Sequence, residues 1–202
     1  MRTRNLAILF VSLFVIAGAV FSIGARAEGE VPAPPAIGAT IEDFTLPDVD
    51  NKDRSLKSLA GKNGTVLLFI AVQCPVSNAY NERMAKLAED YQAKGIAIVG
   101  INSNVAEDAA AVKAHAAEHK LSFPILKDPG NKIADRFGAS VTPEAYFIDA
   151  NSKLLYHGRI DNSRNAAQVE SNDLRNALDS ALSGKGIEKT EAKAFGCSIK
   201  RG

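Results

Sequence analysis

Residues 66–83 read VLLFIAVQCPVSNAYNER, an apolar run that stops at a cysteine and continues with the spacing of a helix. The part before the cysteine is aliphatic and aromatic and short enough for a buried strand. Beyond Ala79, the apolar side chains of Met84, Leu87 and Tyr91 recur on one helical face. We therefore predict a buried strand followed by a helix, with the cysteine at the junction between them.

Cys74 is the residue at this junction. Pro75 suits the first turn of a helix, where its missing N–H is no loss, so Cys74 falls at or near the N-cap. A thiol there meets unpaired backbone N–H groups and the positive end of the helix dipole, which favour the thiolate. We predict a reactive cysteine whose pKa lies below that of a free thiol. The alternative is a buried, inert cysteine that ends a core strand.

The composition limits the possible functions. The 202 residues suffice for one domain with a complete core. The 24 Lys and Arg against 23 Asp and Glu leave a net charge of +1, so there is no field to attract nucleic acid, and we exclude such a partner. The 2 cysteines are too few for a disulfide scaffold and too far apart for a zinc knuckle. They are enough for one bridge or one redox couple.

Residues 1–27 have the features of an export signal. Two arginines precede a long apolar stretch, and residues 25–27 (Ala-Arg-Ala) have the small-x-small form of a cleavage site. The alternative is an uncleaved anchor, the only case in which a membrane would be a partner. Either outcome places the domain in an oxidising compartment, which is the periplasm if the source is Gram-negative. Residues 28–36, rich in proline, are expected to be an extended linker.

The rest of the chain alternates between strand and helix patterns. Residues 37–183 are expected to form one domain, and residues 184–202 a polar tail that carries Cys197. The buried early strands and the late hairpin indicate an α/β sandwich with a central mixed sheet. The expected strands cover residues 66–72, 96–101, 123–126, 141–149 and 154–160, and the main helices lie after residue 79 and at 106–120 and 172–182.

This order of elements, with a cysteine after the long strand and Thr142 and Pro143 opening a later one, resembles the thioredoxin-like superfamily. Residues 44–48 and 66–74 are similar to the redoxin branch, which includes the alkyl hydroperoxide reductase and thiol-specific antioxidant family. A narrower resemblance is to peroxiredoxin-like redoxins with a Cys-Pro-x-x-x-x-Tyr-x-x-Arg helix and a terminal Gly-Cys-Ser-Ile-Lys, motifs found here at residues 74–83 and 196–200. The resemblance implies thiol-based redox chemistry in a thioredoxin-like fold, with no cofactor.

The chain departs from the family pattern in two places. Thioredoxins and exported disulfide reductases use Cys-x-x-Cys, in which the second thiol resolves the mixed disulfide. Here the second position is Ser77, whose hydroxyl cannot do so. Typical peroxiredoxins have a Thr or Ser three residues before the cysteine and a proline four residues earlier. These positions are Ala71 and Leu67, so half of the peroxide-binding motif is absent.

Cys197 is the candidate for the missing thiol, because the polar tail is expected to be loose enough to fold back. In the functional interpretation, Cys74 attacks a disulfide or a peroxide, and Cys197 then displaces the product or condenses with the sulfenic acid. The partners would be a protein dithiol or disulfide and a small thiol or peroxide. In the structural interpretation, a Cys74–Cys197 disulfide is a permanent staple.

Four further residues are candidate parts of the site. The resemblance implies that Pro143, preceded by Thr142, is the cis-proline that faces the active cysteine and offers backbone to a substrate. Arg83 could support the thiolate, hold an acidic side chain or point to solvent. Arg159 could lower the pKa of the thiolate and polarise a peroxide, as one arginine does in peroxiredoxins, or form a structural ion pair.

Metal binding is the basis of the main alternative. His115 and His119 share a helix face, but no further ligand is evident, and we expect that face to be solvated. His157 with Cys74 is similar to the copper-carrying Sco-type relatives, although Asn78 stands where their second cysteine would be. A copper(I) metallochaperone and a non-catalytic domain with a structural disulfide are therefore the alternatives. The leading hypothesis is an exported thiol-dependent oxidoreductase, with peroxiredoxin-like activity slightly favoured over disulfide exchange.

Overall fold

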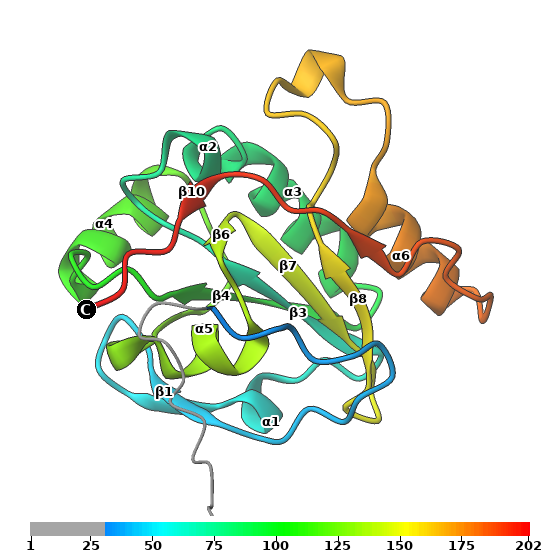
Figure 1. The fold of residues 1–202 in the computed structure, drawn as a ribbon, viewed down its shortest axis with the longest axis horizontal. Helices are drawn as coiled ribbons and strands as arrows, with labels where there is room; N and C mark the ends of the chain where they lie inside the picture. The colour runs from blue at the N-terminus through cyan, green and yellow to red at the C-terminus, as the bar shows by residue number, and fades with distance from the viewer. Residues whose placement is uncertain (1–30) are drawn as a thin grey trace, which may run out of the picture. The chain divides into compact units, whose positions relative to one another are not determined.

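The computed structural model describes residues 31–202. The expected export signal and residues 28–30 of the expected linker lie outside the described residues. A six-stranded sheet has the order β5-β4-β3-β7-β8-β9, with β3 parallel to β4 and antiparallel to β7 (Figure 1). The predicted sandwich with a central mixed sheet is confirmed. Its strands are β3 (Gly64–Phe69), β4 (Ile96–Asn102), β5 (Ile125–Lys127), β7 (Glu144–Ile148), β8 (Leu154–Gly158) and β9 (Glu191–Ala192).

Helices lie on both faces of this sheet, and two small two-stranded sheets are separate from it. The helices are α1 (Leu56–Leu59), α2 (Pro75–Asn78), α3 (Asn81–Gln92), α4 (Ala109–Glu118), α5 (Lys132–Phe137) and α6 (Asp173–Leu182), with 3₁₀ turns η1 (Pro129–Asn131) and η2 (Ala166–Gln168). Of these, α3 and α6 pack on one face of the sheet and α5 on the other. The small sheets pair β1 (Thr45–Pro47) with β2 (Asp53–Ser55), and β6 (Val141–Thr142) with β10 (Cys197–Ser198).

Strand β3 organises the core because its side chains alternate between the two faces of the sheet. Val66 and Leu68 belong to the cluster that includes buried residues of α3 and α6, whereas Leu67 and Phe69 belong to the cluster on the other face, with Phe137 of α5. All six residues of β3 are buried. The strand therefore fixes the position of the loop and the cysteine that follow it.

The helix expected to begin at Pro75 and continue beyond Ala79 is interrupted. It is divided into the single turn α2 and the longer α3, and the chain between them passes through Ala79 and Tyr80, with Tyr80 as the N-cap of α3 at φ −100° and ψ −5°. The predicted apolar face of α3 is confirmed, since Met84, Leu87 and Tyr91 are each at most 1% exposed.

The expectation of a loose C-terminal tail is wrong. Strand β9 pairs in parallel with β8, and β10 pairs antiparallel with β6. Ile199, next along the chain, is only 5% exposed and packs in the core with residues of β3 and α5. Arg201 then forms an ion pair with Asp135, with 2.9 Å between Nε and Oδ1. Figure 1 shows this segment in red, crossing from β9 beside α6 to β10 beside β6.

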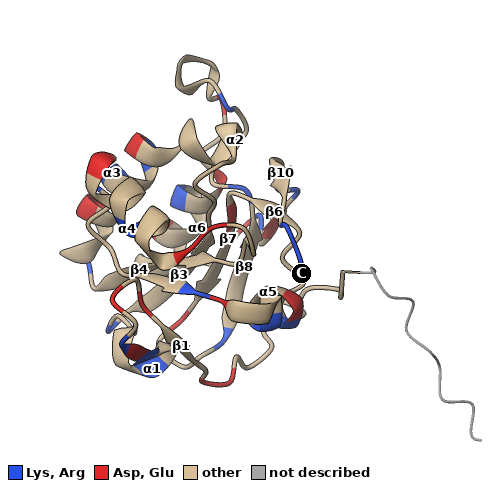
Figure 2. Cartoon of the chain, turned by 90° about the vertical axis from the view of Figure 1, so that its left-hand side faces the viewer, with Lys and Arg blue, Asp and Glu red and all other residues tan. Residues whose placement is uncertain are grey.

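The charged side chains do not gather into a region of one sign. In Figure 2 the blue and red segments are interspersed over the elements of the fold, in keeping with the net charge of +1. Between residues 31 and 202, no helix combines the length and the apolar character that crossing a membrane requires.

Candidate active site

Cys74 follows the loop after β3 and is the N-cap of α2, as predicted. Its sulfur accepts a hydrogen bond from the backbone N–H of Ser77 at 3.2 Å, and Pro75 occupies the first turn. The side chain is buried, with 3% of its surface exposed. Because α2 has only one turn, its dipole is small, and the electrostatic environment of the sulfur is set mainly by local hydrogen bonds.

The opposite wall of the site is the short strand β6. The Thr142–Pro143 peptide bond is cis, as the family resemblance implies. The Cys74 thiol donates a hydrogen bond to the Thr142 carbonyl at 3.2 Å. The Thr142 hydroxyl is buried against the same sulfur and has no other hydrogen-bond partner in the described part of the chain. Thr142 and Pro143 therefore lie beside the cysteine, as expected.

Cys197 comes to the same place on β10, in register with Thr142. Both cysteines are free thiols, with Cys74 buried and Cys197 half-buried. Burial disfavours a thiolate at Cys74, but hydrogen bonds from Cys197, Thr142 and the Ser77 backbone outweigh it and hold the pKa of Cys74 below its ordinary value. The same Cys74–Cys197 hydrogen bond raises the pKa of Cys197, and burial adds to it. The pair thus combines one thiol of lowered pKa with one of raised pKa.

This asymmetry predicts the pH dependence of alkylation. In the reduced protein, the rate of iodoacetamide addition to Cys74 should rise with pH, with a midpoint below the ~8.5 of a free thiol. The rate of addition to Cys197 should rise with a midpoint above that value. Cys197→Ala removes the largest of the contributions that lower the pKa of Cys74, so the pH midpoint for alkylation of Cys74 should move upward. Mass spectrometry of each cysteine peptide across the pH range measures both midpoints. An unchanged Cys74 midpoint in Cys197→Ala would contradict the proposed coupling.

Glu107 fixes the loop that leads to Cys74. Its carboxylate accepts the backbone N–H groups of Val72 and Gln73, both at 2.9 Å, and the side-chain amides of Asn102 and Asn104. These bonds outweigh burial and hold the pKa of Glu107 below its ordinary value. The sequence analysis missed this residue. The sequence feature that could have identified Glu107 is the polar segment 102–107 at the end of the buried strand β4. Such a segment is more often interpreted as a solvated loop.

Glu144 fixes the other wall in a similar way. One carboxylate oxygen accepts the N–H groups of Ser140 and Val141 at 2.9 and 3.2 Å, and the other lies 2.6 Å from His157 Nε2 and accepts from the Tyr146 hydroxyl at 3.0 Å. Burial opposes ionisation, but these partners hold the pKa of Glu144 low. His157 is therefore engaged at the base of the β6 loop, a role that the sequence analysis did not predict.

The two candidate arginines do not contact Cys74. Arg83 binds Asp161 at 2.6 Å and the carbonyls of Ser163 and Arg164, so it holds the loop after β8 against α3. Arg159 binds Asp173, with 2.7 Å between Nε and Oδ2. Neither guanidinium therefore supports the Cys74 thiolate, which was one of the roles considered for each arginine. The ion-pair alternative holds for both, because a buried carboxylate requires a charged partner.

The histidines offer no assembled metal site. His157 is bound to Glu144. His115 is buried, contrary to the expected solvated face, and its ring lies 4.3 Å from that of His119. Within residues 31–202, no group of three or more His, Cys, Asp or Glu side chains is arranged to hold a metal ion.

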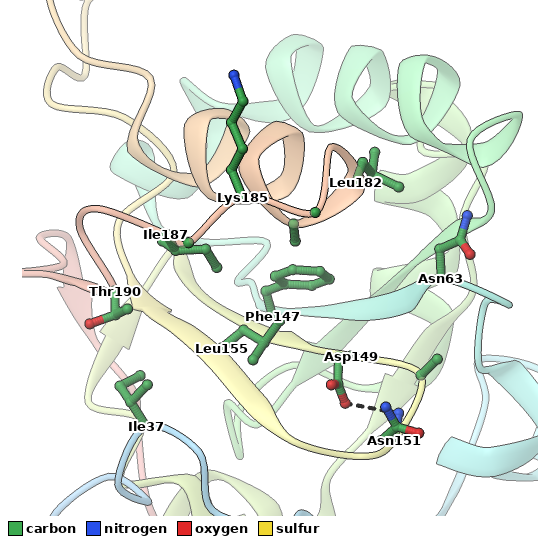
Figure 3. Close-up of a pocket in the computed structure, with 14 residues that line it drawn as sticks. Ile37, Asn63, Phe147, Asp149, Asn151, Leu155, Leu182, Lys185, Ile187 and Thr190 are labelled. Carbon is green, nitrogen blue, oxygen red and sulfur yellow. Dashed lines mark hydrogen bonds between the residues drawn. The ribbon is translucent and has the colours of Figure 1, made fainter.

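A cavity of about 570 Å³ lies away from the cysteines, between the end of α6 and the β7–β8 hairpin (Figure 3). Phe147 and Leu155 form part of its apolar lining, and Lys185 and Asp149 are among its polar residues. None of its lining residues is a cysteine or belongs to β6. The cavity therefore forms no part of the surroundings of Cys74.

Comparison with known proteins adds three relatives. The model of the AhpC/TSA family matches residues 37–157. The thiol-disulfide oxidoreductase ResA of Bacillus thuringiensis (strain Al Hakam) is 29% identical over 158 residues, which cover 77% of this chain and 88% of ResA. The chloroplastic peroxiredoxin Q of Triticum aestivum is 29% identical over 126 residues, 59% of this chain and 57% of that protein. A solved structure of a hypothetical protein from Sinorhizobium meliloti 1021 has 34% identity and a TM-score of 0.78, covering 83% of this chain and 96% of that one.

Proposed function

Because this chain belongs to the AhpC/TSA family, we propose that it is a thiol–disulfide oxidoreductase with Cys74 as nucleophile and Cys197 as resolving thiol. One observation carries the proposal. The free thiol of Cys197 lies on β10 opposite Thr142, whose carbonyl accepts the free thiol of Cys74, and in this arrangement the pKa of Cys74 is lowered and that of Cys197 is raised. Such a pair has the attacking sulfur ionised and the second sulfur in reserve.

The proposed reaction has two exchange steps. The Cys74 thiolate attacks one sulfur of a substrate disulfide, so a mixed disulfide forms and the other substrate sulfur leaves and takes up a proton. The Cys197 sulfur then attacks the Cys74 sulfur, the bound substrate leaves as a thiol with the proton from Cys197, and a Cys74–Cys197 disulfide remains. Two electrons have passed to the substrate, and an external dithiol returns the protein to its reduced form.

Disulfide exchange is supported better than peroxide reduction. Peroxide reduction benefits from a guanidinium that polarises the peroxide, yet Arg159 is bound to Asp173. Ala71 and Leu67 provide no hydroxyl or proline at the peroxide-ordering positions. Peroxide reduction is the second candidate, favoured by the adjacent resolving thiol, which could condense with a sulfenic acid. It differs in its first product, which is sulfenic acid at Cys74 instead of a mixed disulfide.

Cys197→Ser separates these outcomes. Without the resolving sulfur, treatment with a small disulfide should leave a stable mixed disulfide at Cys74, visible as an added mass on that cysteine alone. Multiple turnover should fall to the background rate. Treatment with hydrogen peroxide at equal concentration should give sulfenic acid only slowly. Normal turnover in Cys197→Ser would refute the resolving role, and faster oxidation by peroxide than by disulfide would favour the second candidate.

The reduction potential tests the structural alternative. The wild-type protein is equilibrated in glutathione buffers, and the Cys74–Cys197 disulfide is quantified by mass spectrometry. A potential above about −250 mV would indicate a labile redox couple, whereas one below about −300 mV would indicate a permanent staple. The second result would direct attention to binding functions, beginning with copper(I).

We also propose that residues 1–27 direct export and that the domain works in an oxidising compartment. The support is the pattern of two arginines, an apolar stretch and the Ala-Arg-Ala site. Mass spectrometry of the protein from its native cell would find an N-terminus near Glu28 if the signal is cleaved. An intact N-terminus in the membrane fraction would indicate an anchor.

A further inference from the structure

A short turn after β4 contacts both of the segments that carry the thiols. We call residues 104–107 the 104–107 turn, which is closed by the Glu107 N–H, donated to the Asn104 carbonyl at 3.3 Å. At the end of this turn, the Glu107 carboxylate accepts the N–H groups of Val72 and Gln73, directly before Cys74. The turn therefore fixes the loop that carries the first thiol.

The beginning of the same turn binds the segment that carries Cys197. The Lys200 N–H donates to the side-chain oxygen of Asn104 at 2.8 Å. The Lys200 carbonyl accepts the Val105 N–H at 3.1 Å. Both backbone groups of Lys200 are thus bound to the 104–107 turn, three residues beyond Cys197. One turn of the chain therefore fixes both thiol-bearing segments.

Asn104 joins these two sets of bonds. Its side-chain nitrogen donates to a carboxylate oxygen of Glu107 at 3.0 Å, and its side-chain oxygen accepts from Lys200. The orientation of the amide follows from its partners, because a carboxylate only accepts hydrogen bonds and a backbone N–H only donates them. Asn104 and Glu107 are 8% and 3% exposed. At such burial an unpaired polar group is costly, so the amide keeps both bonds.

We propose that Asn104 is a positioning residue for the second exchange step, in which it holds Cys197 at the separation from Cys74 that lets the two sulfurs react. The inference rests on the proposed disulfide exchange. In that step the Cys197 sulfur attacks the Cys74 sulfur of the mixed disulfide, and the substrate leaves as a thiol with the proton of Cys197. A fixed separation raises the effective concentration of Cys197 at Cys74, and a misplacement of about 1 Å can slow a reaction by about 100-fold.

Two variants weaken the connection at different bonds. Asn104→Ala removes the amide that binds Glu107 and Lys200. Val105→Pro removes only the N–H that the Lys200 carbonyl accepts. The proline suits the fold, because Val105 is the second residue of the turn, where proline is favoured, and is 63% exposed. Val105→Pro therefore decides the question if Asn104→Ala does not fold.

Asn162→Ala is the matched control. The Asn162 side chain also makes two hydrogen bonds, which it accepts from the N–H groups of Glu170 and Ser171 in its own loop. Its removal loses the same number of side-chain hydrogen bonds as Asn104→Ala and leaves the 104–107 turn intact. A change that appears in both variants therefore reports general destabilisation.

The first measurement is the effective concentration of Cys197 at Cys74. The fraction of Cys74–Cys197 disulfide is determined in glutathione buffers, where one oxidised glutathione is reduced to two thiols for each protein disulfide formed. Asn104→Ala should lower the effective concentration by about tenfold, which raises the reduction potential by about 30 mV. Val105→Pro should lower it by about fivefold, the equivalent of one hydrogen bond. Asn162→Ala should leave it unchanged.

The second measurement separates the two exchange steps. The reduced protein is mixed with 2-hydroxyethyl disulfide and quenched with acid, and mass spectrometry follows the mixed disulfide at Cys74 and its conversion to the internal disulfide. In Asn104→Ala the first rate should be unchanged, because Glu107 retains its bonds to the Val72 and Gln73 N–H groups. The second rate should fall by about tenfold.

Three results would overturn the inference. Wild-type effective concentrations in the folded variants would show that Asn104 does not set the separation. An equal shift in Asn162→Ala would assign the effect to general destabilisation. Equal slowing of both steps in Asn104→Ala would assign it to the reactivity of Cys74.

The wild-type protein distinguishes failure of this inference from failure of the proposed function. If the wild type forms the mixed disulfide and resolves it, the proposed function stands whatever the variants do. If the wild type forms no mixed disulfide with 2-hydroxyethyl disulfide, the proposed function is overturned and this inference with it.

Discussion

Cys74→Ser is expected to abolish disulfide exchange, with a loss on the order of 10⁴-fold or more, as removal of a catalytic nucleophile costs in other enzymes. The serine hydroxyl does not ionise near neutral pH and cannot form a mixed disulfide. It can still accept the Ser77 N–H, because the capping bond seen at 3.2 Å in the wild type needs only an acceptor at this position. The variant should therefore lose its chemistry and keep its fold.

Two measurements distinguish this loss from damage to the structure. Thermal unfolding should occur within a few degrees of the wild type, and Cys197, left without its sulfur partner, should be alkylated with a lower pH midpoint. That second change follows because the hydrogen bond to Cys74 is the largest cause of the raised pKa of Cys197. Wild-type turnover in Cys74→Ser would assign the chemistry to Cys197 alone and reverse the proposed roles.

The predictions that succeeded depend on local patterns. The buried apolar strand at residues 66–69, the apolar face of α3 and the Cys74–Pro75 junction can each be recognised within a few residues. The cis bond at Pro143 and the approach of Cys197 to Cys74 were not derivable in this way. The cis bond was implied by the family resemblance. The approach of Cys197 was expected because Ser77 cannot act as the second thiol, on the premise of a loose tail.

The predictions that failed depend on distant partners. Strands β9 and β10 have two residues each, too short for any periodicity, and β10 stays in place through the burial of Ile199 and the clearance at Gly196. Two roles stayed open for Arg159, at the thiolate or in an ion pair, because nothing in its neighbourhood identifies Asp173 as its partner. Such pairings are decided by the assembled sheet, where each buried polar group must find a partner.

Glu107→Ala is expected to lower the free energy of unfolding by about 3–5 kcal/mol, the usual cost of removing one member of a buried, charged network. The deletion leaves the N–H groups of Val72 and Gln73 without their acceptor. It also leaves Lys127 without the nearby negative charge that raises its pKa against the effect of burial. Urea unfolding monitored by circular dichroism measures the loss, and Glu118→Ala on the exposed end of α4 is the control, expected to change little.

Glu107→Gln isolates the contribution of charge, since it retains one oxygen for a backbone N–H. The pKa of Glu107 is lowered in the folded protein, so its stabilising effect is present above the unfolded pKa of about 4.3 and is lost as the pH falls through the folded value. Between those two values, the stability of the wild type should fall more steeply with decreasing pH than that of Glu107→Gln. Parallel curves would show that Glu107 acts through packing. A flatter curve for the variant would establish that an ionised carboxylate holds the loop before Cys74 in place.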